Sequence, residues 1–336
     1  MAKMKAVQAS KPNAPFEVVE RDVPEPGPGQ VRIKVEACGV CHSDAFVRAG
    51  AFPGMVLPRI PGHEIAGRID AVGSGVTEWK AGERVGVGWH GGHCFVCDPC
   101  RRGLFLNCVN AKITGISHDG GYAEYTVVPH ESVARIPENL SAVDAGPLLC
   151  AGVTTFNALR NAGARPGDTV AVQGIGGLGH LGLQFAAKMG FRTVAVSSGA
   201  DKEALARQLG AHDYVDTKKT PAAEALKKLG GADLILATAP HSEAIADAAQ
   251  GLKARGKLLI VAAPFEPLKV NVFGLLTGKT IAGWPSGSSV DSEDAMAFSA
   301  LTGVRPRTEV LKLEQAEQAL AKVMENTVRF RAVLTP

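Results

Sequence analysis

The first part of the chain consists of short runs in which apolar and polar residues alternate, each interrupted by Gly or Pro. The segments 31–40 (VRIKVEACGV), 64–73 (EIAGRIDAVG) and 122–129 (YAEYTVVP) are examples. Alternation with a period of two predicts strands with one buried face, and frequent turns favour a barrel-like arrangement. We therefore expect residues 1–148 to form a compact, partly open β-barrel.

From about residue 149 the pattern changes to continuous apolar runs separated by segments of helical periodicity. The run 168–174 (DTVAVQG) precedes a helical pattern at 178–190, and 232–239 (ADLILATA) and 256–263 (GKLLIVAA) continue the alternation. Buried strands alternating with helices predict a doubly wound parallel sheet of the Rossmann type over residues 149–286.

The last part of the chain, residues 287–336, shows one helical stretch at 313–326 (LEQAEQALAKVMEN) and a β-like end. This segment is too short for a third domain, so we assign it to the first. The 336 residues are also more than one core usually supports, which favours two domains.

The composition is that of a globular protein, with 46% hydrophobic and 21% charged residues. The net charge of +3 is spread over interspersed acids and bases, so no nucleic acid partner is indicated. No secretory signal and no apolar run of about 20 residues is visible, which gives no reason to expect a membrane. Cysteines at metal-ligand spacing without an export signal predict a cytoplasmic protein.

Four of the seven cysteines lie within a lobe at about residues 91–110, with the spacing C-x2-C-x2-C-x7-C through Cys94, Cys97, Cys100 and Cys108. This spacing suits one tetrahedral zinc ion with no open position, hence a structural site. His90 and His93 flank the cluster and are expected at the surface or a pocket rim, because four cysteines already complete it.

A glycine-rich turn follows the strand predicted at 168–174. Gly174, Gly176 and Gly179, with Gly177 between them, match G-x-G-x-x-G and open the helix predicted at 178–190. Such a turn lets the backbone approach a pyrophosphate at a helix N-terminus. We therefore expect a bound dinucleotide.

The next predicted strand ends in Ser197 and Ser198 rather than in an acid that would bind the ribose hydroxyls of NAD. Two hydroxyls and the nearby Lys202 favour a 2′-phosphate, whereas Asp201 opposes it. This pattern favours NADP over NAD.

Outside the lobe, Cys41, His63 and Cys150 each lie at the end of a run beside Gly or Pro. Two cysteines and one histidine suit a catalytic zinc with an open fourth position. Taken alone, three such scattered residues are more often buried core residues than ligands.

The segment 62–76 (GHEIAGRIDAVGSGV) matches the signature G-H-E-x2-G-x5-G-x2-V of the zinc-dependent medium-chain alcohol dehydrogenases. The motifs GVCHSD, the four-cysteine lobe, C-A-G-x-T and GIGGLG follow in the order typical of that family. The chain thus resembles this family over essentially its whole length. The resemblance implies a GroES-like catalytic domain (1–148 and 287–336), a Rossmann domain (149–286) and two zinc ions per chain.

The resemblance also implies roles for individual residues. Cys41, His63 and Cys150 match the catalytic zinc ligands, Glu64 their neighbour, Ser43 the hydroxyl that takes the alcohol proton, and Asp44 the carboxylate that steadies His63. Further matches are the nicotinamide contact Thr154, the pyrophosphate contacts His42 and Arg331, and the substrate-cleft residues Phe46, Phe52 and Trp89.

Two features depart from many relatives. Phe46 stands where a histidine commonly passes the proton to solvent, and Ser197 replaces the acid that selects NAD. Both resemble the cinnamyl-alcohol-dehydrogenase-like branch. They favour larger aliphatic or aromatic substrates.

The expected activity is hydride transfer between a primary alcohol and NAD(P), in an alcohol dehydrogenase or aldehyde reductase. One alternative is a zinc-free quinone or enoyl reductase of the same superfamily, and another is a non-enzymatic zinc or redox sensor. The family resemblance also leads us to expect a homo-oligomer, either a tetramer or a dimer.

Overall fold

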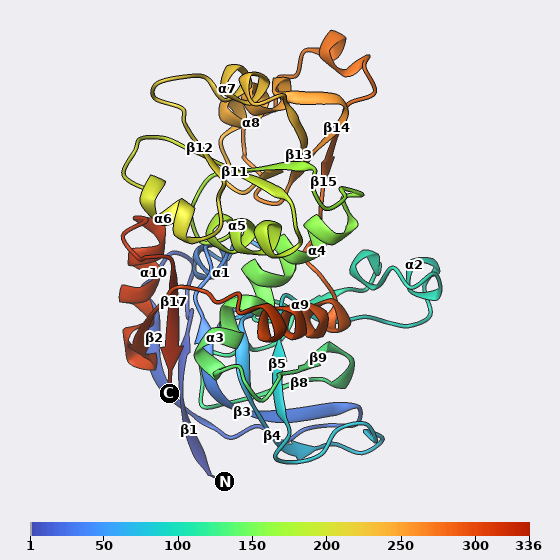
Figure 1. Cartoon of the computed structure of the whole chain (residues 1–336). Helices are drawn as coiled ribbons and strands as arrows, with labels where there is room; N and C mark the ends of the chain where they lie inside the picture. Colours follow the sequence, from blue (N-terminus) through green and yellow to red (C-terminus); the bar gives the residue numbers. More distant parts are fainter. Residues whose placement is uncertain (1) are drawn as a thin grey trace. The chain divides into compact units, whose positions relative to one another are not determined.

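The computed structural model describes residues 2–336, which divide into two compact units. The first comprises the described residues up to Val153 together with Gly287–Pro336, and the second comprises Thr154–Ser286. In Figure 1 the first unit runs from blue to green and returns in red, whereas the second runs from green to orange. Among the described residues, no helix is long and apolar enough to cross a membrane.

The first unit is built on a seven-stranded sheet in the order β16-β17-β3-β4-β5-β9, with β8 also paired to β3. Along β3 every second residue from Val31 to Val35 is buried, as the alternation predicts. The strands are β3 Gln30–Gly39, β4 Ile65–Val72, β5 Arg84–Val87, β8 Tyr125–Pro129, β9 Val133–Arg135, β16 Thr308–Lys312 and β17 Arg331–Thr335, with the separate pairs β1 Lys3–Gln8 and β2 Glu17–Asp22, and β6 His90–Gly92 and β7 Lys112–Ile113.

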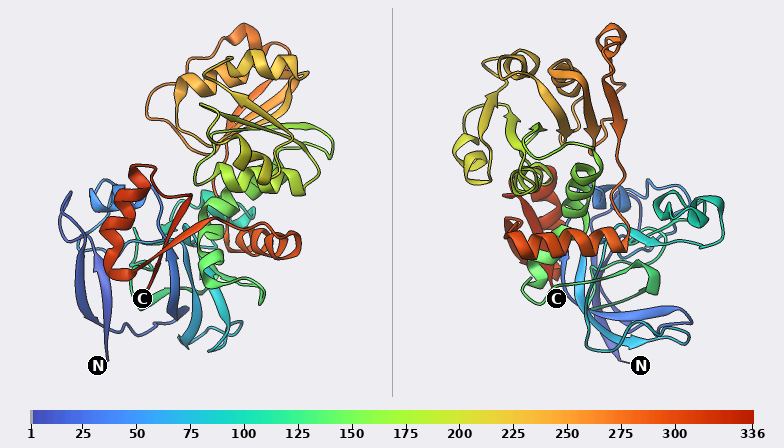
Figure 2. Two further views of the ribbon diagram at one scale, coloured as in Figure 1. Left: turned by 60° about the vertical axis from the view of Figure 1, so that its left-hand side comes forward. Right: turned by 45° about the vertical axis from the view of Figure 1, so that its right-hand side comes forward.

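The helices of the first unit are mostly short. They are α1 Asp44–Arg48, α2 Asp98–Arg101, α3 Ala142–Pro147, the π-helical turn η3 Leu148–Gly152, α9 Ser289–Thr302 and α10 Ala316–Met324, with single 3-10 turns at η1 Phe105–Asn107, η2 His130–Ser132 and η5 Leu313–Gln315. Figure 2 shows α10 against the C-terminal strand β17.

The prediction of a single helix after residue 286 was wrong, because α9 precedes α10. Ser288 caps α9 in a capping box with Asp291. Its buried positions include Ser292 and Ser299, whose hydroxyls donate to the carbonyls of Ser288 and Ala295 in the preceding turn. Buried serines hid the apolar stripe that usually reveals a helix.

The second unit is a six-stranded, wholly parallel sheet in the order β12-β11-β10-β13-β14-β15. This is the doubly wound order of dinucleotide-binding domains, so the predicted Rossmann fold is confirmed. All five residues of β10 are buried, as expected of a strand covered on both faces. The strands are β10 Thr169–Gln173, β11 Arg192–Ser197, β12 Asp213–Asp216, β13 Ala232–Ala237, β14 Leu252–Ile260 and β15 Thr280–Gly283.

Helices cover both faces of this parallel sheet (Figure 2). On one face α4 and α5 pack together, with the rings of Phe156 and Phe185 5.4 Å apart. On the other face α7 packs against α8. The helices are α4 Val153–Asn161, α5 Gly179–Lys188, α6 Glu203–Gln208, α7 Ala222–Lys228, α8 Ser242–Gln250 and the 3-10 turn η4 Val272–Leu275.

Candidate metal centres and nucleotide site

Three segments of the first unit bring Cys41, His63 and Cys150 together. Cys41 follows β3, His63 precedes β4, and Cys150 lies in the π-helical turn η3. Single π-helical turns are rare and occur frequently at functional sites. The turn thus presents the Cys150 thiol to two loops that are far away in sequence.

The distances within this group match a tetrahedral zinc site. The sulfur atoms of Cys41 and Cys150 are 3.9 Å apart, and His63 Nε2 lies 3.4 Å from Cys150 Sγ. Two thiolates around a tetrahedral zinc are about 3.8 Å apart, and a thiolate and an imidazole nitrogen about 3.5 Å. Glu64 also has a carboxylate oxygen within 4.8 Å of the other three ligand atoms. The residues present therefore fit zinc with three protein ligands and Glu64 in reach.

Burial and mutual contact shift the pKa values of all three candidate ligands. The hydrogen bond from Cys150, with the charge of His63, holds the pKa of Cys41 well below its usual value. The same hydrogen bond and burial raise the pKa of Cys150. Burial alone would lower the pKa of His63, but the charge of Cys41 and the hydrogen bond to Asp44 raise it well above its usual value. One thiolate is thus already favoured in the protein by itself.

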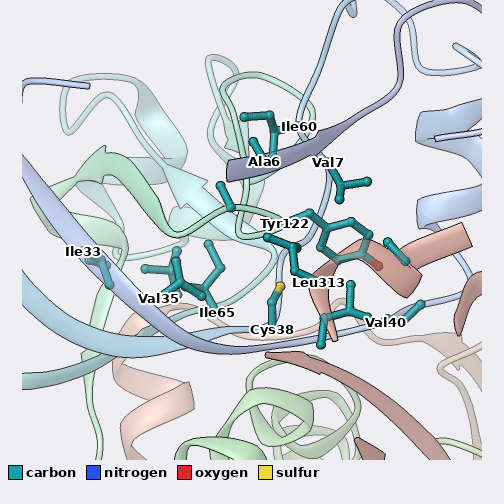
Figure 3. Packing of buried hydrophobic residues seen from close by; sticks show 14 of the residues in the cluster. Ala6, Val7, Ile33, Val35, Cys38, Val40, Ile60, Ile65, Tyr122 and Leu313 are labelled. Atoms are coloured by element: carbon teal, nitrogen blue, oxygen red, sulfur yellow. The ribbon is translucent and has the colours of Figure 1, made fainter. Parts of the chain in front are cut away.

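Asp44 supports two of the three ligands. Its Oδ1 lies 3.6 Å from His63 Nδ1, and its Oδ2 accepts a hydrogen bond of 2.8 Å from the backbone amide of Cys41. Tyr122 donates its hydroxyl to the same Oδ2 at 2.9 Å. The role of Tyr122 could not be predicted from local sequence, because its hydroxyl meets a carboxylate 78 positions away. Figure 3 shows its ring in the apolar core near Val7 and Leu313.

Behind the ligands, Glu64 forms a fully buried ion pair with Arg331, the first residue of β17. Glu64 Oε2 and Arg331 Nε are buried without a hydrogen-bond partner. Burial raises the pKa of Glu64 and the charge of Arg331 opposes that rise. The structure thus brings Arg331 to the ligand group, and its role toward a pyrophosphate remains a prediction.

The side chains predicted to line the cleft form a connected row of rings. The Trp89 ring meets the His63 ring edge-on at 5.0 Å, Phe52 lies 6.1 Å from Trp89, and Phe46 lies 6.3 Å from Phe52. His42 lies 6.4 Å from Phe46. Ser43, between Cys41 and Asp44 in the chain, has a buried hydroxyl with no hydrogen-bond partner. An aromatic wall and one unengaged hydroxyl therefore adjoin the ligands.

The four lobe cysteines form the second candidate metal centre. Cys108 Sγ lies 3.8 Å from Cys97 Sγ and 3.5 Å from Cys94 Sγ, and all four sulfur atoms lie within 4.8 Å of one another. Backbone amides of Cys97 and Val96 lower the pKa of Cys94 to about 6, which favours a thiolate. The four donors fit a closed zinc site that has no position for a substrate.

The placement predicted for His90 at the surface or a pocket rim was wrong. His90 is 4% exposed and stacks on His93 with ring centroids 5.1 Å apart. Its Nε2 lies 3.1 Å from His93 Nδ1. His90 lies in β6, which pairs with β7, so the strand pairing buries it.

The glycine turn of the second unit connects β10 to α5. Gly174 has φ +91°, and a Cβ atom on Gly179 would lie 1.9 Å from the Gly174 carbonyl oxygen. A Cβ atom on Gly176 would meet nothing within 4 Å, so this part of the turn is open. The turn therefore combines tight helix packing with an accessible backbone, as a pyrophosphate requires. Gly177 lies in the same turn.

The other predicted nucleotide residues of the second unit lie as follows. Ser197 is the last residue of β11 and Ser198 follows it, while Lys202 Nζ donates to the Ile175 carbonyl of the glycine turn at 3.3 Å. Thr154 Oγ1 donates to Ser286 Oγ at 3.0 Å. Lys202 is thus directed toward the glycine turn.

Comparison with known proteins agrees with these sites. Residues 27–138 match the model of the alcohol dehydrogenase GroES-like domain, and residues 177–300 match that of the zinc-binding dehydrogenases. The alcohol dehydrogenase patD of Penicillium expansum is 50% identical over 308 residues, covering 91% of this chain and 90% of that protein.

Two solved structures share the fold over almost the whole chain. The cinnamyl alcohol dehydrogenase SbCAD4 of Sorghum bicolor has a TM-score of 0.89 at 32% identity, covering 99% of this chain and 98% of the other. The enzyme named CAD from Helicobacter pylori, solved with NADP(H), has a TM-score of 0.88 at 27% identity, with 99% and 98% coverage. The chain therefore belongs to the zinc-dependent medium-chain alcohol dehydrogenases and is an oxidoreductase, an alcohol dehydrogenase or aldehyde reductase.

Proposed function

We propose that this enzyme interconverts aromatic or larger aliphatic primary alcohols and their aldehydes, with NADP(H) as the favoured coenzyme. The observation that carries this proposal is the group of Cys41, His63 and Cys150 at zinc-binding distances beside a row of aromatic rings. When bound there, zinc would supply a Lewis acid that polarises the oxygen of the substrate.

The protein's own residues would then position the reactants and hold the proton. Ser43 has a buried hydroxyl without a partner, next in the chain to the ligand-supporting Asp44, and we assign it the substrate proton. Phe46 cannot carry that proton further, so the proton would leave through water or the ribose hydroxyls. Asp44 keeps His63 oriented, and Glu64 supplies a carboxylate within reach of the ligand group.

The row of aromatic rings beside the ligand group supports the proposed substrate class. Phe46, Phe52 and Trp89 offer ring faces and edges, and edge-to-face contacts between aromatic groups stabilise beyond their buried area. An aldehyde with an aromatic ring would make such contacts, whereas a short aliphatic aldehyde would not.

The coenzyme preference is supported by the end of β11. Ser197 and Ser198 stand where a carboxylate would repel a 2′-phosphate. The Helicobacter pylori relative of similar fold was solved with NADP(H). We assign the pyrophosphate to the turn with Gly174, Gly176, Gly177 and Gly179, with contacts from His42 and Arg331, and the nicotinamide to Thr154.

We also infer a homo-oligomer. Phe265, Val272, Phe273 and Leu276 are all at least 70% exposed, and they precede β15, the last strand of its sheet. Exposed apolar side chains that precede an edge strand favour association with a second copy of the chain. All seven cysteines are free thiols. Six belong to the two candidate zinc groups, and the seventh, Cys38, is buried. Free thiols support a reducing compartment such as the cytoplasm.

The test of the proposed function is benzaldehyde reduction by the zinc-replete protein with NADPH and with NADH, alongside Cys41→Ser and zinc analysis. We expect a higher kcat/KM with NADPH, two zinc ions in the wild type, and one zinc with little activity in the variant. Unchanged turnover in Cys41→Ser would refute the zinc mechanism. Reduction of quinones or enones by a protein without zinc would favour the alternative reductase instead.

A further inference from the structure

The loops that follow β11 and β12 lie side by side in the second unit. The two strands are parallel neighbours, with Ser197 paired in register with Asp216. The backbone amide of Thr217 donates to the Ser197 carbonyl at 2.9 Å. Ligands of doubly wound folds bind at the carboxyl ends of the strands, so the β12 loop stands beside the proposed ribose site.

A single carboxylate fixes the geometry of these two loops. Asp216 Oδ1 accepts hydrogen bonds from the amides of Gly199 at 2.7 Å and Lys218 at 3.0 Å. Tyr214 donates its hydroxyl to the Gly199 carbonyl at 2.6 Å. Hydrogen bonds to Asp216 therefore hold the backbone of Lys218 beside the turn at Gly199. Gly199 has φ +85°, a conformation that disfavours residues with a side chain.

The ammonium group of Lys218 reaches back over this turn. A Cβ atom built on Gly199 would lie 3.7 Å from Lys218 Nζ. Lys218 is exposed, and none of the described carboxylates forms an ion pair with it. Lys202, the cation that the sequence suggests, instead donates to the Ile175 carbonyl. Lys202 is thus engaged at the glycine turn after β10, whereas Lys218 lies over the turn at Gly199.

Asp201 places a negative charge beside this turn. Its Oδ1 would lie 3.0 Å from the same Cβ position on Gly199, so a carboxylate borders the place where a phosphate would bind. A lysine ammonium is a compact charge that binds phosphate well. Lys218 offsets the charge of Asp201 at the Gly199 turn, whereas Lys202 is engaged at the glycine turn.

We propose that Lys218 is a specificity-determining residue that binds the 2′-phosphate of NADP(H) together with the hydroxyls of Ser197 and Ser198. This inference rests on the NADP preference in the proposed function and names the residue that produces it. Local sequence does not reveal this role, because Lys218 lies on the loop after the next strand, β12.

The experiment uses the full-length, zinc-replete enzyme and two probes, 2′,5′-ADP and 5′-AMP, with dissociation constants from isothermal titration calorimetry. Lys218→Met is compared with Lys219→Met, a matched change of the adjacent exposed lysine, and with Lys218→Arg, which keeps the charge. We expect the wild type to bind 2′,5′-ADP more tightly. In Lys218→Met the ratio of the two constants should fall about ten- to a hundredfold. Lys219→Met and Lys218→Arg should keep most of the ratio.

Two outcomes would overturn the inference, and they are distinguishable. If the wild type prefers 2′,5′-ADP and Lys218→Met keeps that preference, Lys218 is not the reader of the phosphate, and the NADP proposal stands. If the wild type binds both probes equally, the NADP preference fails and the role of Lys218 fails with it, while the zinc chemistry is untouched.

Discussion

Glu64 and Arg331, 267 positions apart, form an ion pair in which the Glu64 side chain is fully buried and that of Arg331 is 5% exposed. Burial alone would lower the pKa of Arg331, but the charges of Glu64 and of the Cys41 thiolate raise it above its usual value. The pair thus joins the first residue of the C-terminal strand β17 to the ligand group.

The first prediction concerns this pair. Arg331→Met should reduce the free energy of unfolding by about 3–5 kcal/mol, because it leaves the Glu64 carboxylate buried without a counter-charge. Urea denaturation would measure the loss. The double variant Glu64→Gln/Arg331→Met should recover part of it. If the double variant is no more stable than the single one, the uncompensated charge is not the cause.

Tyr122→Phe removes the hydroxyl that donates to Asp44 and keeps the ring in the core. We expect the affinity for catalytic zinc to fall about tenfold or more, because groups behind metal ligands commonly contribute that much. Competition with a zinc chelator measures the affinity, and the absorption spectrum of the cobalt-substituted enzyme reports the ligand geometry. Tyr125→Phe, three positions away on β8, should leave both unchanged. Equal zinc affinity in the two variants would show that Tyr122 only fills space.

Ser43→Ala tests the residue assigned to the proton. The hydroxyl has no hydrogen-bond partner, so its removal should leave the thermal midpoint close to that of the wild type. The value of kcat should fall about a hundredfold or more, as is typical when a proton-transfer group is lost. A kcat within a factor of two of the wild type would assign the proton to another group.

Loss of the lobe zinc should reduce stability, whereas loss of the catalytic zinc should abolish activity. Cys97→Ser should lose the lobe zinc, lower the thermal midpoint and weaken the oligomer, because a closed site contributes to folding. Cys41→Ser should lose the other zinc and the activity while keeping assembly. Zinc analysis, calorimetry and analytical ultracentrifugation would check both variants. Unchanged assembly and midpoint in Cys97→Ser would contradict the structural role.

His90 gives a prediction on pH. Burial, with a smaller contribution from the charge of His93 and an opposing one from Asp291, lowers the pKa of His90 to about 4. Between pH 6.5 and 4 the unfolded chain therefore binds more protons than the folded protein, so the free energy of unfolding falls as the pH falls. The full shift corresponds to about 3 kcal/mol.

His90→Asn should flatten part of this dependence. Urea denaturation of both proteins at pH 7 and pH 5 would show it, since zinc release at low pH affects both alike. His241→Asn, a change of an exposed histidine, is the control. The same slope in wild type and His90→Asn would contradict the assignment.

Much of this protein follows from local patterns in the sequence. The parallel sheet could be predicted because its strands are continuous apolar runs, and the glycine turn because Gly174, Gly176 and Gly179 have fixed spacing between a strand and a helix. The lobe cysteines could be grouped because all four lie within 15 residues of one another. These features depend on neighbours in the chain, so the residue order is sufficient to reveal them.

The tertiary structure decided what depends on contacts between distant segments. Tyr122 meets Asp44 and Arg331 meets Glu64 because segments far apart in sequence lie next to each other. Lys218 reaches the turn at Gly199 because β12 pairs with β11. The predictions for helix α9 and for His90 were wrong because both depend on polar residues that the fold buries. Serine and histidine can be buried where packing and hydrogen bonds allow it. The sequence by itself determined the family, the two folds and the types of metal ligand. Only the tertiary structure decided which charged and polar groups surround those ligands, because contacts between distant residues depend on distance in space.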